Sequence, residues 1–93
     1  MSPEQDFQVR NGLDHSTLVE LFAWSEAEFG ERMRGSPIRR IGYERWLRNL
    51  AVGLGNAFAT EEIIKALKEK KDHASPLVRE HVRWALERHG VAA

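Results

Sequence analysis

The spacing of apolar residues constrains this chain more than any other feature of its sequence. After about residue 15, apolar side chains recur at steps of three and four, which is the period of a helix with one buried face. No stretch alternates apolar and polar residues as a half-buried strand does. We therefore predict an all-α fold of about five helices, with an extended lead-in over residues 1–15 and a single helical domain over residues 16–90.

Helix start signals divide residues 16–90 into five segments. The signals are capping hydroxyls, two of which have glutamate three residues later, and Ser-Pro pairs that combine a cap with a proline suited to the first turn. The predicted starts are Thr17, Ser25, Ser36-Pro37, Thr60 and Ser75-Pro76. We expect Gly42 to interrupt the third segment, so that its main helix runs from Tyr43 to about Ala57.

Two glycines lie inside that main helix, where glycine is unfavourable. Gly53 and Gly55 each cost a helix about 1 kcal/mol relative to alanine, so we expect both to permit close approach, most simply by a neighbouring helix.

An offset of 32 residues aligns "VGLGN" from Val52 with "WALER" from Trp84. This offset falls in the range of helical repeats, and predicts two stacked helix pairs of the HEAT type plus a lead helix.

The composition argues against several chemistries. The chain has no cysteine, so it holds no disulfide, thiolate nucleophile or cysteine-ligated cluster of its own. No two of its four histidines are four residues apart, and Asp72, His73 and Ser75 are explained by a turn and a helix cap. We predict no catalytic residue and no metal in this chain.

With neither a leader nor an apolar run long enough to span a membrane, we expect a cytoplasmic location without membrane contact.

Positive charge is concentrated in one segment of a neutral chain. Residues 32–48 carry six arginines and one acid, whereas residues 1–31 carry seven acids and one base. We expect Arg39 and Arg40 to lie where a helix begins, and arginine forks and the free N–H groups at a helix start both suit phosphate oxygens. We predict that a nucleic-acid-binding face is formed by Arg39, Arg40, Arg45, Arg48 and Asn49.

A second interpretation of these arginines stays open on spacing alone. They can pair with Glu26, Glu28 or Glu31 of the acidic segment and join one helix to another. Such surface pairs contribute about 0–1 kcal/mol each, so stability by itself does not account for the cluster.

One long stretch resembles a known family. The run "LVELFAWSEAEFGERMRGSPIRRIGYERWLRNLAVGLGNA", followed by "SPLVREHVRWAL", is similar to the C-terminal HEAT-like region of epoxyqueuosine reductases. The likeness extends from about Asp6 to Leu86, and "GSPIRRIGYERWLRN" followed by "GLGN" is its most specific part. Within that part, Trp46 belongs to the apolar stripe of the main helix and is expected to be structural; the stripe consists of Tyr43, Trp46, Leu47, Leu50 and Leu54. The resemblance assigns no role to Glu80 or His81, which lie near the end of the chain.

The resemblance implies a function for the arginines. Members of the family are cytoplasmic bacterial enzymes that use cobalamin and two 4Fe-4S clusters to reduce epoxyqueuosine to queuosine in tRNA. Their catalytic domain precedes the region that this chain resembles. The chain is therefore expected to be a non-catalytic, monomeric domain without a cofactor of its own. Its expected partners are the tRNA anticodon stem-loop and the iron-sulfur domain of the same parent protein.

The main rival interpretation is a docking module that makes no nucleic-acid contact. The predicted buried stripe of the last helix consists of Val78, Val82, Ala85 and Leu86. Leu77 and Trp84 lie off this stripe and offer a face for another domain. A helix-turn-helix DNA binder fits less well, because Tyr43 to Leu54 is too apolar to serve as a recognition helix.

Overall fold

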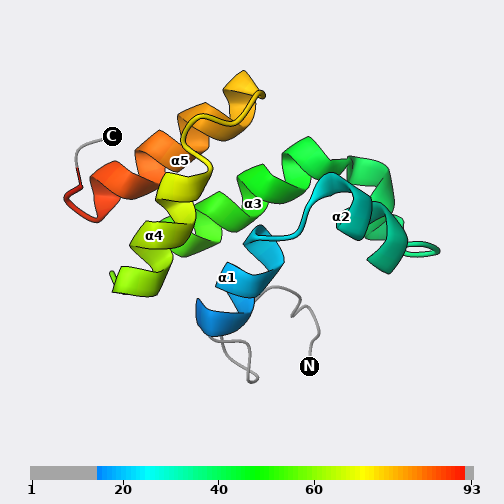
Figure 1. Ribbon diagram of the computed structural model, residues 1–93, viewed down its shortest axis with the longest axis horizontal. Coiled ribbons are helices and arrows are strands. Elements are labelled where there is room, and N and C mark those ends of the chain that lie inside the picture. Colours follow the sequence, from blue (N-terminus) through cyan, green and yellow to red (C-terminus); the bar gives the residue numbers. More distant parts are fainter. Residues whose placement is uncertain (1–14, 92–93) are drawn as a thin grey trace.

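The computed structural model describes residues 15–91, and over this range the chain is helical and contains no strand (Figure 1). The all-α prediction is therefore confirmed. The elements are α1 (His15–Phe22), α2 (Glu26–Arg32), the 3-10 helix η2 (Pro37–Ile41), α3 (Tyr43–Asn56), α4 (Glu61–Glu69) and α5 (Pro76–Arg88).

Helix caps account for most of the element boundaries. The Ser25 hydroxyl accepts a hydrogen bond from the Glu28 N–H at 3.1 Å, and the Glu28 carboxylate accepts one from the Ser25 N–H at 2.9 Å, which confirms the predicted capping box. Thr60 and Ser75 cap α4 and α5 as predicted. The prediction for Thr17 is wrong, because the two residues before it are already helical and it lies inside α1.

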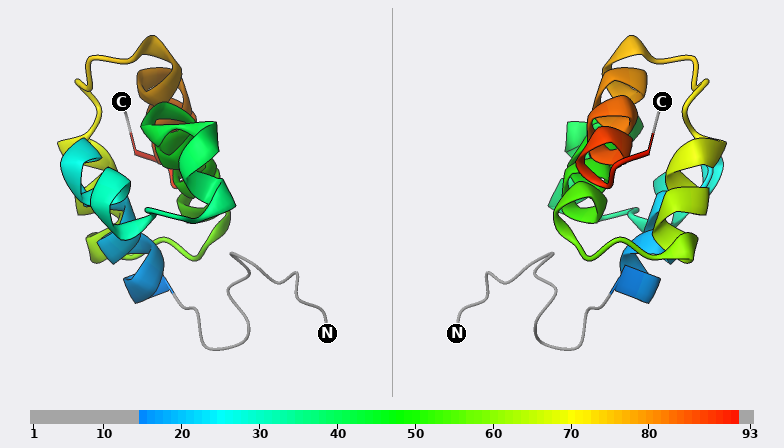
Figure 2. Two further views of the ribbon diagram at one scale, coloured as in Figure 1. Left: turned by 90° about the vertical axis from the view of Figure 1, so that its right-hand side faces the viewer. Right: turned by 90° about the vertical axis from the view of Figure 1, so that its left-hand side faces the viewer.

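The helices form two layers (Figure 2). α3 and α5 lie side by side, run in the same direction and make the most extensive contact between elements, while α1 packs against both α3 and α4 (Figure 1). In the alignment with an offset of 32 residues, the end of α3 corresponds to the end of α5. The HEAT-type arrangement of two stacked helix pairs plus a lead helix stays a prediction. Among the described residues, α1 packs against α3, α4 packs against α5, and α2 and η2 lie between α1 and α3 along the chain.

The core lies between these layers. Burying its apolar side chains supplies the main driving force for folding, at about 25 cal/mol per Å² of apolar surface removed from water. Residues of the core that are less than 2% exposed include Phe22, Trp46, Leu47, Leu54, Ile63, Leu67, Val78, Val82, Ala85 and Leu86. The stripe predicted for α5 is fully confirmed.

The two glycines of α3 differ in their surroundings. A Cβ atom at Gly55 would lie 2.6 Å from Cζ3 of Trp84 and 3.1 Å from the Cα atom of Ala85, so α5 approaches α3 closely there. A Cβ atom at Gly53 would lie 3.7 Å from the nearest Leu18 carbon, which is an ordinary contact. The expectation of a close approach is confirmed for Gly55 and wrong for Gly53, because the two residues face different neighbours.

The predicted lead-in lies outside the described residues except for His15, which belongs to α1. Within residues 15–91, none of the helices combines the length and the apolar character needed to cross a membrane.

Candidate nucleic-acid interface

An aromatic cluster fixes α2 against the first half of α3. The Trp24 and Trp46 rings are stacked, with their centroids 5.5 Å apart, and Phe29 lies 5.1 Å from Trp46 and 5.8 Å from Tyr43. The Tyr43 hydroxyl donates a hydrogen bond to the Trp24 carbonyl. These contacts set the position of the 3-10 helix η2, which connects α2 to α3.

η2 is a short element with its own start and stop. The Ser36 hydroxyl accepts from the Ile38 N–H at 3.1 Å, and Pro37 occupies the first turn. Gly42, with a φ of 90°, then ends η2 and precedes α3. Gly42 interrupts the third segment as predicted. The expectation that Arg39 and Arg40 lie at a helix start needs correction, because they occupy the last turn of η2, separated from α3 by Gly42.

The arginine side chains of this region are not neutralised by carboxylates within residues 15–91. Arg39, Arg40 and Arg45 are exposed, and no salt bridge joins any of them to an acid of the described chain. The salt bridge found in this part of the chain joins Arg34 to Glu31 instead. The alternative salt-bridge layer with Glu26, Glu28 and Glu31 is therefore not formed by these arginines among the described residues.

Arg48 and Asn49 form a local pair on α3. The Arg48 Nε and Nη2 atoms donate to the Asn49 side-chain oxygen at 3.2 and 2.9 Å. The amide carries no charge, so it orients the guanidinium and leaves its positive charge uncompensated. The five predicted residues thus lie on two consecutive elements: Arg39 and Arg40 on η2, and Arg45, Arg48 and Asn49 away from the buried stripe of α3.

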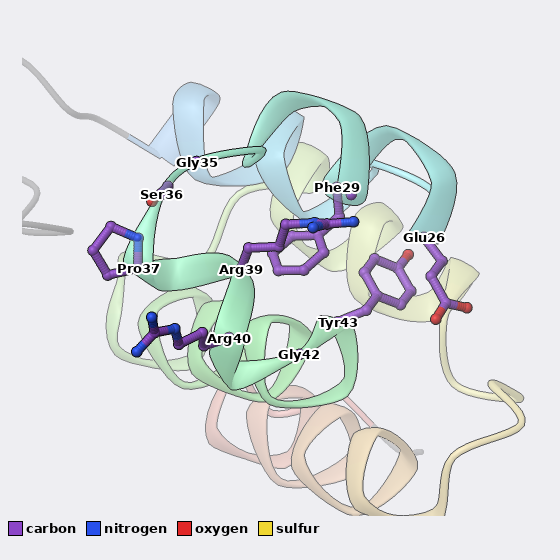
Figure 3. A pocket seen from close by; sticks show the side chains of 10 residues that line it. Glu26, Phe29, Gly35, Ser36, Pro37, Arg39, Arg40, Gly42 and Tyr43 are labelled. Atoms are coloured by element: carbon purple, nitrogen blue, oxygen red, sulfur yellow. The ribbon is translucent and has the colours of Figure 1, made fainter.

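A surface hollow of about 710 Å³ lies between α2, η2 and the start of α3 (Figure 3). Arg39 reaches from η2 toward α2, and Glu26 lies at the other end beyond Tyr43 (Figure 3). Arg40 points away from α2 on the far side of η2 (Figure 3). The lining includes Glu26, Phe29, Gly30, Arg39, Arg40 and Tyr43. Sequence reasoning missed this hollow, because only the folding of α2 back onto α3 creates it.

Tyr43 has an altered acidity within this hollow. Burial raises the pKa of its phenol above the ordinary value of 10.0, and the negative charges of Glu26 and Glu28 raise it further. The neutral phenol, which donates to the Trp24 carbonyl, is thus the form that the folded protein favours.

The shift in Tyr43 predicts a measurable loss of stability in alkali. Because the folded protein holds this proton more strongly than the unfolded chain does, the free energy of unfolding should fall as pH rises above about 10. Tyr43→Phe should remove this component of the decline. Denaturant unfolding of the two proteins at a series of pH values measures the difference.

The same chain offers a direct control for that titration. Tyr43 is its only tyrosine, so the ultraviolet absorbance of tyrosinate reports this residue alone. A midpoint at or below 10.0 in the folded protein would contradict the prediction.

His73, His81, His89 and the 72–75 turn have structural roles. The His81 Nδ1–H donates to the Leu77 carbonyl at 2.9 Å, and the His89 Nε2–H donates to the Leu54 carbonyl at 2.8 Å. The Ser75 N–H donates to His73 Nδ1 at 3.0 Å, and its hydroxyl accepts from the Val78 N–H, as the predicted turn and cap require. Among the described residues, no cluster of three potential ligands could hold a metal ion.

Known proteins resemble this chain over most of its length. Over 85 residues the chain is 64% identical to an epoxyqueuosine reductase of Pseudomonas aeruginosa, a match that covers 91% of this chain and 24% of the relative. The corresponding protein of Xanthomonas campestris is 60% identical over 95% of this chain and 25% of its own length. That of Escherichia coli is 50% identical over 92% and 22%. No family model matches the chain, and no solved structure does.

The chain is an all-helical domain that spans about a quarter of the length of the curated relatives it matches. Those relatives are epoxyqueuosine reductases, and the chain corresponds to one part of them. The resemblance predicted from the sequence is confirmed.

Proposed function

We propose that this chain is the non-catalytic, tRNA-binding part of an epoxyqueuosine reductase, and that it holds the anticodon stem-loop. The observation that carries the proposal is the group of exposed guanidinium groups at Arg39, Arg40 and Arg45, which have no carboxylate partner among the described residues. An RNA backbone supplies the anions that such groups bind, through charge-assisted and often bidentate hydrogen bonds.

In this proposal the domain contributes affinity and orientation, and the rest of the parent protein performs the reduction. Contacts to phosphates fix where RNA lies without reading its sequence. The chain has no cysteine, so the two 4Fe-4S clusters that the family resemblance implies would take their ligands from another part of the parent. Cobalamin, which the resemblance also implies, would be bound in that other part too. We also propose that the domain is HEAT-like and that it binds tRNA in the cytoplasm.

Removing one arginine of η2 should weaken RNA binding and reduce its dependence on salt. For Arg39→Ala or Arg40→Ala, the slope of log affinity against log salt for an anticodon stem-loop should flatten by about one unit for each lost phosphate contact. Fluorescence anisotropy at several salt concentrations measures both quantities.

A charge-matched control separates contact from net charge. Arg83 is exposed on α5, outside η2 and α3, so Arg83→Ala changes the net charge equally and should leave the slope nearly unchanged. Equal effects of all three substitutions, or none in any of them, would count against the proposed face.

A second candidate function is docking on another domain. Trp84 is 37% exposed, with Arg88 placed 5.4 Å from its ring centroid, and Phe58 of the α3–α4 connection is 91% exposed. A docking module would lose affinity for the catalytic domain on Trp84→Ala or Phe58→Ser and keep its affinity for RNA. The arginine variants should show the reverse pattern under the RNA-binding proposal.

A further inference from the structure

The hollow between α2 and η2 extends the proposed function from a charged face to a defined subsite. We infer that it binds one unpaired nucleotide of the RNA, with the phosphate held by Arg39 and the base against Tyr43. This inference rests on the proposed RNA-binding role and names the part of the RNA that the hollow accepts.

The phosphate end is defined by charge. Arg39 reaches into the hollow toward α2, whereas Arg40 points away from α2 on the far side of η2, so a phosphate in the hollow meets the Arg39 guanidinium (Figure 3). Neither side chain has a carboxylate partner among the described residues, so neither has to break an ion pair to bind an anion. Guanidinium groups present forked N–H donors that match phosphate oxygens.

The base end is defined by shape. Tyr43 is held in place by its hydrogen bond to the Trp24 carbonyl and by the Phe29 ring, whose centroid is 5.8 Å away. Unpaired RNA bases are commonly bound by stacking on aromatic side chains, and a fixed ring loses little entropy in doing so. The hollow, at about 710 Å³, is within the usual range of ligand pockets and leaves room for water beside one nucleotide.

Glu26 and Gly30 restrict the orientation of the nucleotide. The Glu26 carboxylate repels a phosphate from the end of the hollow opposite Arg39, and it can accept an N–H of a base. Gly30 keeps the wall of α2 low, because a Cβ atom there would already lie 3.9 Å from Nη2 of Arg39. A large side chain at this position would fill the hollow without removing a charge.

Titration with small ligands, followed by amide NMR, tests the inference. Uridine monophosphate, inorganic phosphate and uridine are each added to the complete chain. The monophosphate should shift the amides of residues 30 and 35–43 and leave those of α4 and α5 in place. Because base and phosphate act together, it should bind at least about tenfold more tightly than either part alone.

Two substitutions on α2 provide the matched pair. Gly30→Leu should weaken binding of the monophosphate at least about tenfold, whereas Ala27→Leu, at an exposed position of the same helix, should leave it unchanged. Both variants keep every arginine, and their amide spectra report whether the fold is retained. If Gly30→Leu does not keep the fold, Gly30→Met serves as the second filling variant.

The outcomes separate this inference from the proposed function. Equal binding of inorganic phosphate and the monophosphate would overturn the inference, as would shifts outside the hollow or full binding by Gly30→Leu. If the stem-loop binds normally and the monophosphate does not shift the hollow, the inference fails while the proposed function stands. If the monophosphate occupies the hollow and no stem-loop binds, the anticodon role fails instead.

Discussion

Trp46→Ala is expected to lower the free energy of unfolding by about 3–5 kcal/mol, the usual cost of truncating a buried large aromatic residue. Trp46 is 1% exposed, stacks on Trp24 and packs against Phe29, so its removal leaves a cavity where α2 meets α3. Small domains have total stabilities of about 5–15 kcal/mol, so this loss is a large fraction of the whole. Urea unfolding followed by circular dichroism measures it without depending on tryptophan fluorescence.

Trp46→Phe is the control for this prediction. It keeps a ring in contact with Phe29 and Trp24, and should therefore cost clearly less than the alanine variant. A loss below about 1 kcal/mol for Trp46→Ala would mean that the α2–α3 junction contributes little to the folded state. Because α2 forms one wall of the hollow, the alanine variant should also lose the nucleotide response at residues 35–43.

Substituting alanine for the two glycines of α3 is expected to give effects of opposite sign. Gly55→Ala should destabilise the protein by about 1–3 kcal/mol, because its Cβ atom would meet Trp84 and the backbone of Ala85. Gly53→Ala should stabilise it by about 0.5–1 kcal/mol, since alanine favours the helix and the nearest atom is at an ordinary distance. Thermal and urea unfolding of the two single variants measure the difference.

A double variant identifies the source of the strain at Gly55. Trp84→Ala removes the contact at 2.6 Å but leaves the Ala85 Cα atom at 3.1 Å, so it should restore part of the stability lost in Gly55→Ala and not all of it. Stabilisation by Gly55→Ala alone would show that α5 can move away from α3 at little cost.

Local chemistry made much of the fold predictable. The Ser25 box, the Ser36-Pro37 and Ser75-Pro76 starts and the Thr60 cap depend on residues within one helical turn, and each lies at the expected boundary. The buried stripe of α5 follows from the helical period alone. The Thr17 error has the same local origin, because a capping pattern does not exclude a helix that begins earlier.

The residues of the candidate site were selected from the sequence and stay a prediction, while their geometry is described only by the structure. The cluster of arginines is visible in the sequence, and so is the stop at Gly42. Charge pattern did not reveal that Arg34, outside the predicted site, pairs with Glu31, nor that Arg48 is held by Asn49. Such pairings depend on side-chain directions within a turn and on which groups the fold leaves near each other.

The sequence by itself determined the helical period, most of the helix starts, the concentration of positive charge in residues 32–48 and the family resemblance, since all of these depend on residues close together in the chain. Only the tertiary structure decided which α3 glycine meets α5, and it also created the hollow between α2 and η2. The first feature arises from the contact between α3 and α5, and the second from the packing of α2 onto the start of α3. The physical reason is that close packing depends on the distance between surfaces brought together by the whole fold, which no local pattern specifies.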